Sequence, residues 1–152
     1  MDIEKMIKQQ VTRQWAGYIL FWLLTALFAL AYELDLLAEG TWVGQVQKEY
    51  VGETVSVLLT MALIPLALKL YPLLLPRCVK GSEEGRLRAY GHLFLIRLLL
   101  LTVSAWLNLW VYYATLNNIG GLCALITMTA SLFCMPGVQK LKEDLLLVDA
   151  NK

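Results

Sequence analysis

Charged residues and paired cysteines are scarce in this chain of 152 residues. Charged residues make up 16% of the sequence, against about 25% in an average soluble domain, while hydrophobic residues make up 59%. The net charge of +1 argues against a nucleic-acid-binding protein, which needs a strongly basic face. Cys78, Cys123 and Cys134 form no C-x-x-C pair, so their spacing supports neither a disulfide framework nor a zinc site.

The motifs of common catalytic sites are also missing from the sequence. It contains no G-x-S-x-G, H-E-x-x-H, Walker loop or glycine-rich dinucleotide turn. His92 is the one histidine, so a bis-histidine haem site would need a second chain. No pair of carboxylates lies within an apolar segment to transfer protons. We therefore expect a non-enzymatic protein with no metal and no cofactor.

Long apolar stretches are what the chain does have. A helix crosses the hydrocarbon core of a bilayer with about 20 mainly apolar residues, in a range of about 17–25. Four segments have about this length, at residues 15–32, 54–75, 93–113 and 119–135. The last is the shortest and the least apolar of the four. These segments predict an all-α integral membrane bundle of four antiparallel transmembrane helices in a single domain.

The positions of the cations support this fold and give it an orientation. Positively charged short loops stay on the cytoplasmic side of a membrane. Ten lysines and arginines fall on one side of the predicted bundle, whereas the other side has only Lys48. The ten are Lys5, Lys8, Arg13, Arg77, Lys80, Arg86, Arg88, Lys140, Lys142 and Lys152. The pattern predicts a multi-pass protein of the cell membrane, an inner membrane in a bacterium, with both termini cytoplasmic.

The regions outside the four segments also show patterns. Residues 1–14 place apolar residues on one helical face, which predicts either a cytoplasmic helix lying on lipid or an extension of the first span. Ser82 is a predicted N-cap of the third helix, which would then begin well before the bilayer. Residues 138–152 form an amphipathic cytoplasmic tail that could lie on lipid, pack under the bundle or dock a partner. The loop from Glu33 to Glu53 is acidic, which predicts a solvated loop or a surface that attracts cations.

Small residues recur along one face of the fourth segment, at alternating spacings of three and four. They are Gly120, Cys123, Thr127, Ala130, Cys134 and Gly137. Small side chains let helices approach closely in lipid, where burial from water supplies no driving force. The stripe therefore predicts a helix-packing face. Its partner could be another helix of this chain or a second copy.

Polar residues within the other three segments also share faces. Polar groups in hydrocarbon bind one another because no water is available to them, so these faces should meet in the interior. The predicted polar interior contains Thr25, Ser56, Thr60, Ser104 and Asn108. It serves either to hold the helices together or to line a pathway or pocket centred on Asn108.

Lys69 and Arg97 are the two cations within the predicted spans. Both lie in the cytoplasmic half, where a long side chain can extend to the headgroups. The alternative is a shared binding site for an anion or a lipid headgroup. Pro65 and Pro72, which flank Lys69, would favour it by bending the helix. No acidic residue lies in the cytoplasmic half of any span.

Two functions from different classes fit these features. The leading expectation is an accessory, assembly or regulatory subunit of a membrane complex, because the extramembrane regions are minimal and one face suits association. The alternative is a small oligomeric transporter or channel with a cytoplasm-facing anion or lipid-headgroup pocket. The expected partners are the lipid bilayer and either further copies of this chain or a larger membrane complex, and not nucleic acid.

Overall fold

The computed structural model describes residues 3–78, 83–137 and 139–143, and this part of the chain is all-helical. Its main elements are α1 (Ile3–Glu33), α2 (Val46–Cys78), α3 (Glu83–Thr115) and α4 (Asn118–Leu132). Residues 139–143 form a further short helix. The predicted cap at Ser82 and the tail beyond residue 143 lie outside the described residues.

Three of the helices are long and apolar enough to cross a membrane, and they are α1, α2 and α3. They contain 31, 33 and 33 residues, or about 46–50 Å at a rise of about 1.5 Å per residue. This exceeds the hydrocarbon thickness of about 30 Å, so their ends would extend beyond the apolar layer. The prediction of an all-α protein with apolar spans is therefore confirmed for three helices.

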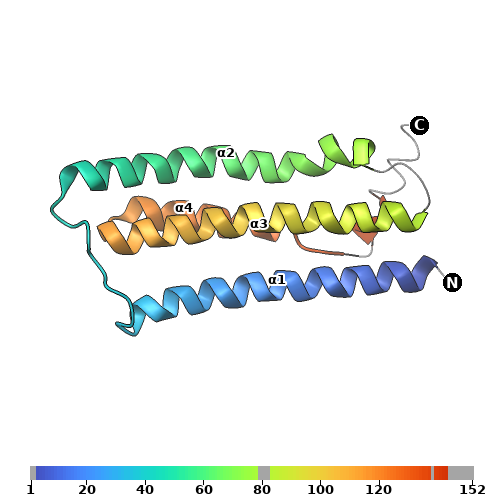
Figure 1. Cartoon of the computed structure of the whole chain (residues 1–152), viewed down its shortest axis with the longest axis horizontal. Coiled ribbons are helices and arrows are strands. Elements are labelled where there is room, and N and C mark those ends of the chain that lie inside the picture. Colours follow the sequence, from blue (N-terminus) through green and yellow to red (C-terminus); the bar gives the residue numbers. More distant parts are fainter. Residues whose placement is uncertain (1–2, 79–82, 138, 144–152) are drawn as a thin grey trace.

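The central helix is α3, because α1, α2 and α4 all pack against it. Figure 1 shows α1 and α2 on opposite sides of α3, with α4 beside α3 and also in contact with α2. Consecutive long helices run in opposite directions. The short turn between α3 and α4 is made by Leu116, whose φ of 53° is left-handed, and by Asn117.

The fourth segment differs from the prediction of a span at 119–135. Helix α4 ends at Leu132 and has 15 residues, so it is only about 22 Å long. Residues 133–137 are not helical. Pro136 has no N–H to satisfy, and the amides of Phe133, Cys134 and Met135 bond back to the last turn of α4 at 3.0–3.3 Å. Gly137 therefore lies beyond the helical stripe to which the sequence assigned it.

The chain nevertheless returns to the end of the bundle from which it started. Leu141 is fully buried in the same apolar cluster as Ile7 and Val11 of α1 and Leu87 and Tyr90 of α3. Residues 3–14 continue α1 without a break, so the arm is an extension of the first helix and packs on α3. The described part of the tail packs against the same end.

The opposite end is closed by the loop between α1 and α2. The amides of Gly40 and Trp42 donate to the carbonyls of Tyr113 and Ala114, at 2.8 and 2.9 Å. The predicted acidic loop from Glu33 to Glu53 is shorter in the structure, because α1 ends at Glu33 and α2 begins at Val46. Three carboxylates at this end of the bundle also act as acceptors. Glu33 accepts from the Tyr113 hydroxyl, Glu49 from the Gly44 amide, and Glu53 from the Asn117 side chain. Glu33 thus joins α1 to α3, Glu49 ties the loop to the start of α2, and Glu53 joins α2 to the turn between α3 and α4.

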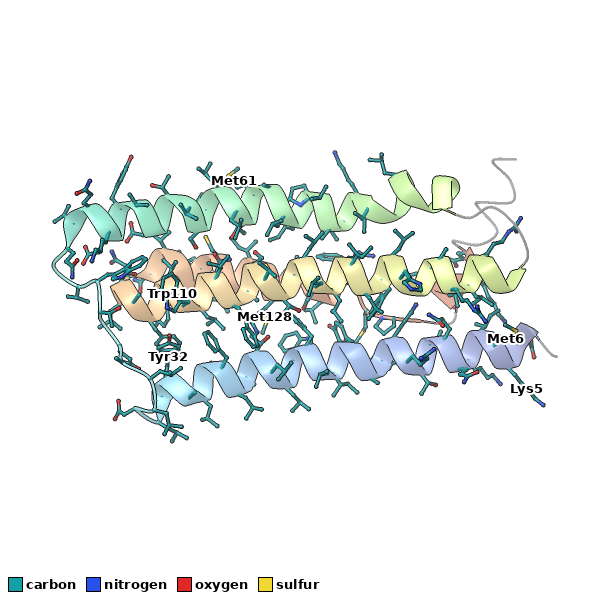
Figure 2. The ribbon with its side chains drawn as sticks, in the orientation of Figure 1. Lys5, Met6, Tyr32, Met61, Trp110 and Met128 are labelled. Carbon is teal, nitrogen blue, oxygen red and sulfur yellow. The ribbon has the colours of Figure 1, made fainter. Side chains whose placement is uncertain are left out.

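The long surfaces between the two ends are apolar. Leu23 is 56% exposed on α1, Leu58 is 62% exposed on α2 and Leu99 is 62% exposed on α3. Figure 2 shows Met61 of α2 directed away from the bundle. A soluble monomer rarely exposes apolar patches larger than a few hundred Å². This surface is suited to contact with lipid.

Candidate functional site

Asn108 lies at the centre of a closed ring of hydrogen bonds between α2 and α3. The Ser56 hydroxyl donates to Asn108 Oδ1 at 2.5 Å, and Asn108 Nδ2 donates to the Thr60 hydroxyl at 2.7 Å. The Thr60 hydroxyl in turn donates to the Ser56 carbonyl at 2.8 Å. Ser56 and Thr60 can both reach Asn108 because residues four apart lie on one face of a helix.

Helix α4 extends the ring through Thr127. Its hydroxyl donates to the Cys123 carbonyl at 2.9 Å and lies 3.4 Å from Asn108 Nδ2 and 3.3 Å from the Ser104 hydroxyl. Because the Thr127 proton is used within α4, Asn108 and Ser104 act as the donors. Asn108 thus uses its carbonyl oxygen and both amide hydrogens. We define these five residues, Ser56, Thr60, Ser104, Asn108 and Thr127, as the Asn108 cluster.

The cluster is buried within the bundle. Each of its five residues is at most 5% exposed. The orientation of the amide is also determined, because Thr60 and Thr127 donate to backbone carbonyls and therefore need donors from Asn108. A group of satisfied polar residues of this kind fixes the register of three helices.

The first helix takes no part in this hydrogen-bonded cluster, although the sequence predicted that its polar face would join. Thr25 is 2% exposed, but its hydroxyl donates to the Phe21 carbonyl of its own helix at 2.8 Å. Helix α1 is instead held to α3 by aromatic contacts. The rings of Tyr32 and Tyr113 are stacked with centroids 4.3 Å apart.

The small-residue face of α4 is directed into the bundle. Gly120, Cys123, Thr127 and Ala130 of α4 are all buried, and so is Cys134 just beyond the end of the helix. A Cβ at Gly120 would lie 2.7 Å from the Tyr112 amide nitrogen and 2.9 Å from the Asn108 carbonyl oxygen. Glycine therefore permits the backbones of α3 and α4 to approach, and the partner of this face lies within the chain.

Thr127 is the member of the cluster that the sequence interpretation missed. Its spacing with Gly120 and Cys123 assigned it to helix packing, and that assignment left its hydroxyl without a role. A hydroxyl at a buried position in lipid needs an acceptor and can accept in turn. This need for hydrogen-bond partners was the feature of the sequence that could have assigned Thr127 to the polar interior.

Lys69 and Arg97 have different surroundings. Lys69 is exposed on α2, whereas Arg97 of α3 is 5% exposed and lies beside the Cys134 thiol where the chain leaves α4. The structure therefore does not show them facing one shared site. Among residues 3–78, 83–137 and 139–143, no group of three His, Cys, Asp or Glu side chains is placed to hold a metal ion.

The fold and the Asn108 cluster define a class of protein, an all-helical chain with three helices that can cross a membrane and a polar interhelical core. Comparison with known proteins adds no family to this class. No family model matches the chain, and no curated protein and no solved structure matches it significantly.

Proposed function

We propose that this chain is a non-enzymatic integral membrane protein that acts as an accessory, assembly or regulatory subunit of a membrane complex. In this proposal α1, α2 and α3 cross the bilayer, and α4 with residues 133–137 returns the chain to its starting side. The basic end, with Lys5, Lys8, Arg13 and Arg88, faces the cytoplasm, because cations resist transfer across the membrane. Both termini are then cytoplasmic.

The observation that supports association with another subunit is a hollow between α2 and α4. We call it the α2–α4 groove. It has a volume of about 510 Å³, and most of its lining side chains are apolar. The side chains that line it include Met61 (70% exposed), Leu122 (58% exposed) and Ile126 (55% exposed).

The occupant that we propose is a transmembrane helix of another subunit. Helix α4 is too short to cross a bilayer of about 30 Å on its own. A hollow filled by the side chains of a neighbouring helix gains dispersion contacts that mobile lipid tails make less regularly. The small-residue face is already used between α3 and α4, which leaves the groove for an external partner.

Site-specific photocrosslinking in the native membrane tests this proposal. A photoreactive residue at Met61 or Leu122 should give one discrete adduct, whereas the same residue at Leu23 or Leu27 on the outer face of α1 should give none. An adduct of twice the chain mass identifies a second copy as the partner. Equal, diffuse labelling at all four positions would mean that lipid alone covers the groove and would contradict the proposal.

The alternative function, a small transporter or channel, receives no support from the polar interior. A pathway needs polar groups that are open to water or to a substrate. The groups of the Asn108 cluster are buried and hydrogen-bond one another, so they are better suited to holding the helices together.

A further inference from the structure

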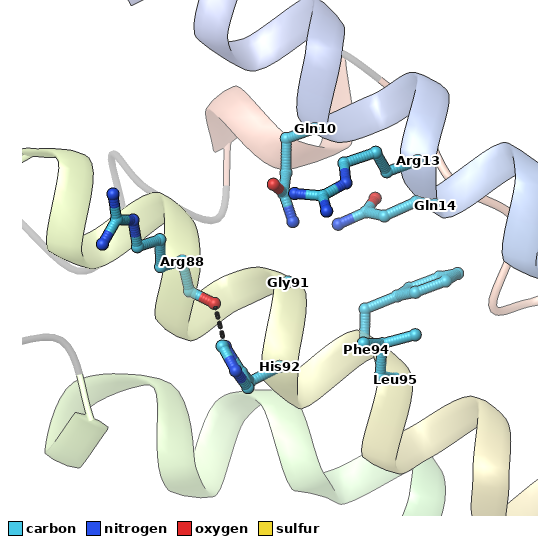
Figure 3. A pocket seen from close by; sticks show the side chains of 8 residues that line it. All are labelled: Gln10, Arg13, Gln14, Arg88, Gly91, His92, Phe94 and Leu95. Carbon is cyan, nitrogen blue, oxygen red and sulfur yellow. Dashed lines mark hydrogen bonds between the residues drawn. The ribbon is translucent and has the colours of Figure 1, made fainter.

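A second hollow lies between α1 and α3 near the basic end of the bundle, and Figure 3 shows it from close by. We call it the α1–α3 groove. Its volume is about 310 Å³, at the lower end of the range of about 300–1,000 Å³ that is usual for ligand sites. Its polar lining comes from Gln10, Arg13 and Gln14 of α1 and from Arg88 and His92 of α3.

Helical spacing builds this groove. Arg13 and Gln14 lie three and four residues after Gln10 and so are near it on one side of α1, while Arg88 and His92 lie four apart on α3. Gly91 faces Gln10 across the groove, and a Cβ at Gly91 would lie only 1.9 Å from Gln10 Nε2. Glycine at this position therefore keeps the space open for the amide. Figure 3 shows Gln10, Arg13 and Gln14 directed from α1 toward α3.

Gln14 supplies an independent sign that the groove suits a ligand. Its side chain is 4% exposed, and its Nε2 has no hydrogen-bond partner among the described residues. An unsatisfied buried donor carries a desolvation cost, so native structures rarely leave one without an acceptor. Gln14 lines the α1–α3 groove. A hydrogen-bond acceptor that enters the groove would satisfy this donor.

The electrostatics of the groove specify that acceptor as an anion. Among the residues that the structure describes, none that lines the groove is acidic. In Figure 3 the Arg13 guanidinium is directed to the same side as the two glutamine amides, while the guanidinium of Arg88 is directed along α3 away from them. His92 Nδ1 bonds to the Arg88 carbonyl at 2.8 Å, which holds the ring in place. A guanidinium and amide donors together match the several acceptor oxygens of a phosphate group.

We propose that the α1–α3 groove binds a phosphate group, that of an anionic phospholipid headgroup. The lipid source is favoured by the apolar side of the groove, where Phe94 and the 58% exposed Leu95 continue the lining toward the middle of α3. A phosphate can lie at the arginine end while an acyl chain follows Leu95. This source rests on the proposed membrane location, but it does not depend on the α2–α4 groove or on any protein partner.

Native mass spectrometry of the purified chain in mild detergent tests the proposal. Phosphatidylglycerol and phosphatidylcholine are the two probes, and the wild type should retain phosphatidylglycerol selectively. Arg13→Gln with Arg88→Gln should weaken its binding by about tenfold or more, because charge-assisted hydrogen bonds are lost. Lys5→Gln with Lys8→Gln is the matched control, since it removes two cations at the same end but outside the groove, and it should change binding less than about twofold.

Two further variants keep the test independent of charge and of folding. Gly91→Leu fills the groove and leaves every cation in place, and Gln14→Leu removes the buried donor. Each variant should lower phosphatidylglycerol binding. Thermal unfolding of each in detergent should stay cooperative, which shows that the variant is still folded. Equal losses in the control pair, or unchanged binding in Gly91→Leu, would overturn the proposal, because attraction would then come from the basic end as a whole. Inorganic phosphate alone separates the sources. If it raises the unfolding temperature of the wild type but not of Gly91→Leu, while phosphatidylglycerol is not retained, the phosphate belongs to a soluble compound and the lipid source is wrong.

Discussion

The Asn108 amide nitrogen lies 2.7 Å from the Thr60 hydroxyl and donates to it, although the two residues are 48 positions apart in the chain. Thr60 lies on α2 and Asn108 on α3, and Thr127 of α4 approaches the same amide. This contact therefore joins three helices at one buried point. Helices in lipid gain no free energy from leaving water, so such polar contacts and close packing determine how they associate.

Replacing Asn108 should destabilise the bundle more than replacing an exposed polar residue. Asn108→Ala leaves Ser56, Thr60 and Thr127 without this partner, and we expect the free energy of unfolding to fall by about 1–3 kcal/mol. A single interhelical contact in a membrane averages about 0.6 kcal/mol, so a value in our range would show that the cluster acts as a unit. Unfolding in increasing denaturing detergent measures the change.

Asn108→Asp and Thr129→Ala sharpen this experiment. The aspartate has the same shape but lacks the amide hydrogens that Thr60 and Thr127 accept, so it should cost more than the alanine. Thr129 is exposed and donates to the Leu125 carbonyl of its own helix, so Thr129→Ala should have almost no effect. Equal stability of Asn108→Asp and the wild type would contradict the assigned hydrogen bonds.

Gly120→Ala should separate α3 from α4. The added Cβ would meet the backbone of Tyr112 and Asn108 at 2.7–2.9 Å, and backbone atoms cannot move away as the end of a side chain can. We expect a loss of about 1–3 kcal/mol, as for other overpacked positions. Gly137→Ala is the control, because its nearest contact would be 4.0 Å away. A destabilisation at Gly137 equal to that at Gly120 would exclude close packing as the cause.

Arg97 and Lys69 should respond differently to neutralisation. Arg97→Met removes a 5% exposed guanidinium beside the point where α4 ends, and we expect it to cost about 1–3 kcal/mol. Lys69→Met changes an exposed residue and should stay within about 0.5 kcal/mol. The same detergent unfolding assay compares them. Equal effects would favour one shared role for both cations, which was the alternative interpretation of the sequence.

Much of the fold can be predicted from the sequence, because a long stretch of apolar residues indicates a helix that contacts lipid rather than water. The apolar lengths of α1, α2 and α3 and the facing positions of Ser56, Thr60 and Asn108 follow from hydropathy and helical spacing. The end of α4 does not. Its apolar character continues to Met135, and the helix stops at Leu132, ahead of a Pro-Gly pair that the prediction placed outside the span.

The α1–α3 groove also could not be predicted from the sequence. Gly91 and Gln10 are 81 positions apart, and neither has a local pattern that marks it. Their relation exists only because α1 continues unbroken to Ile3 and so brings Gln10 and Gln14 against α3. Sequence analysis left this continuation open, with a helix lying on lipid as the alternative. If residues 1–14 lay on the lipid surface instead, Gln10 and Gln14 would not pack against α3 and the groove would not form.

Labelling of single cysteines in intact cells tests the membrane location and orientation most directly. In a Cys78→Ser background, the remaining Cys123 and Cys134 are 6% and 3% exposed, which should keep them unreactive. A membrane-impermeant maleimide should label Glu39→Cys in intact cells, and Lys5→Cys and Lys142→Cys only after permeabilisation. Labelling of Lys5→Cys and Lys142→Cys from opposite sides, or of both from outside, would contradict a bundle whose basic end and two termini face the cytoplasm.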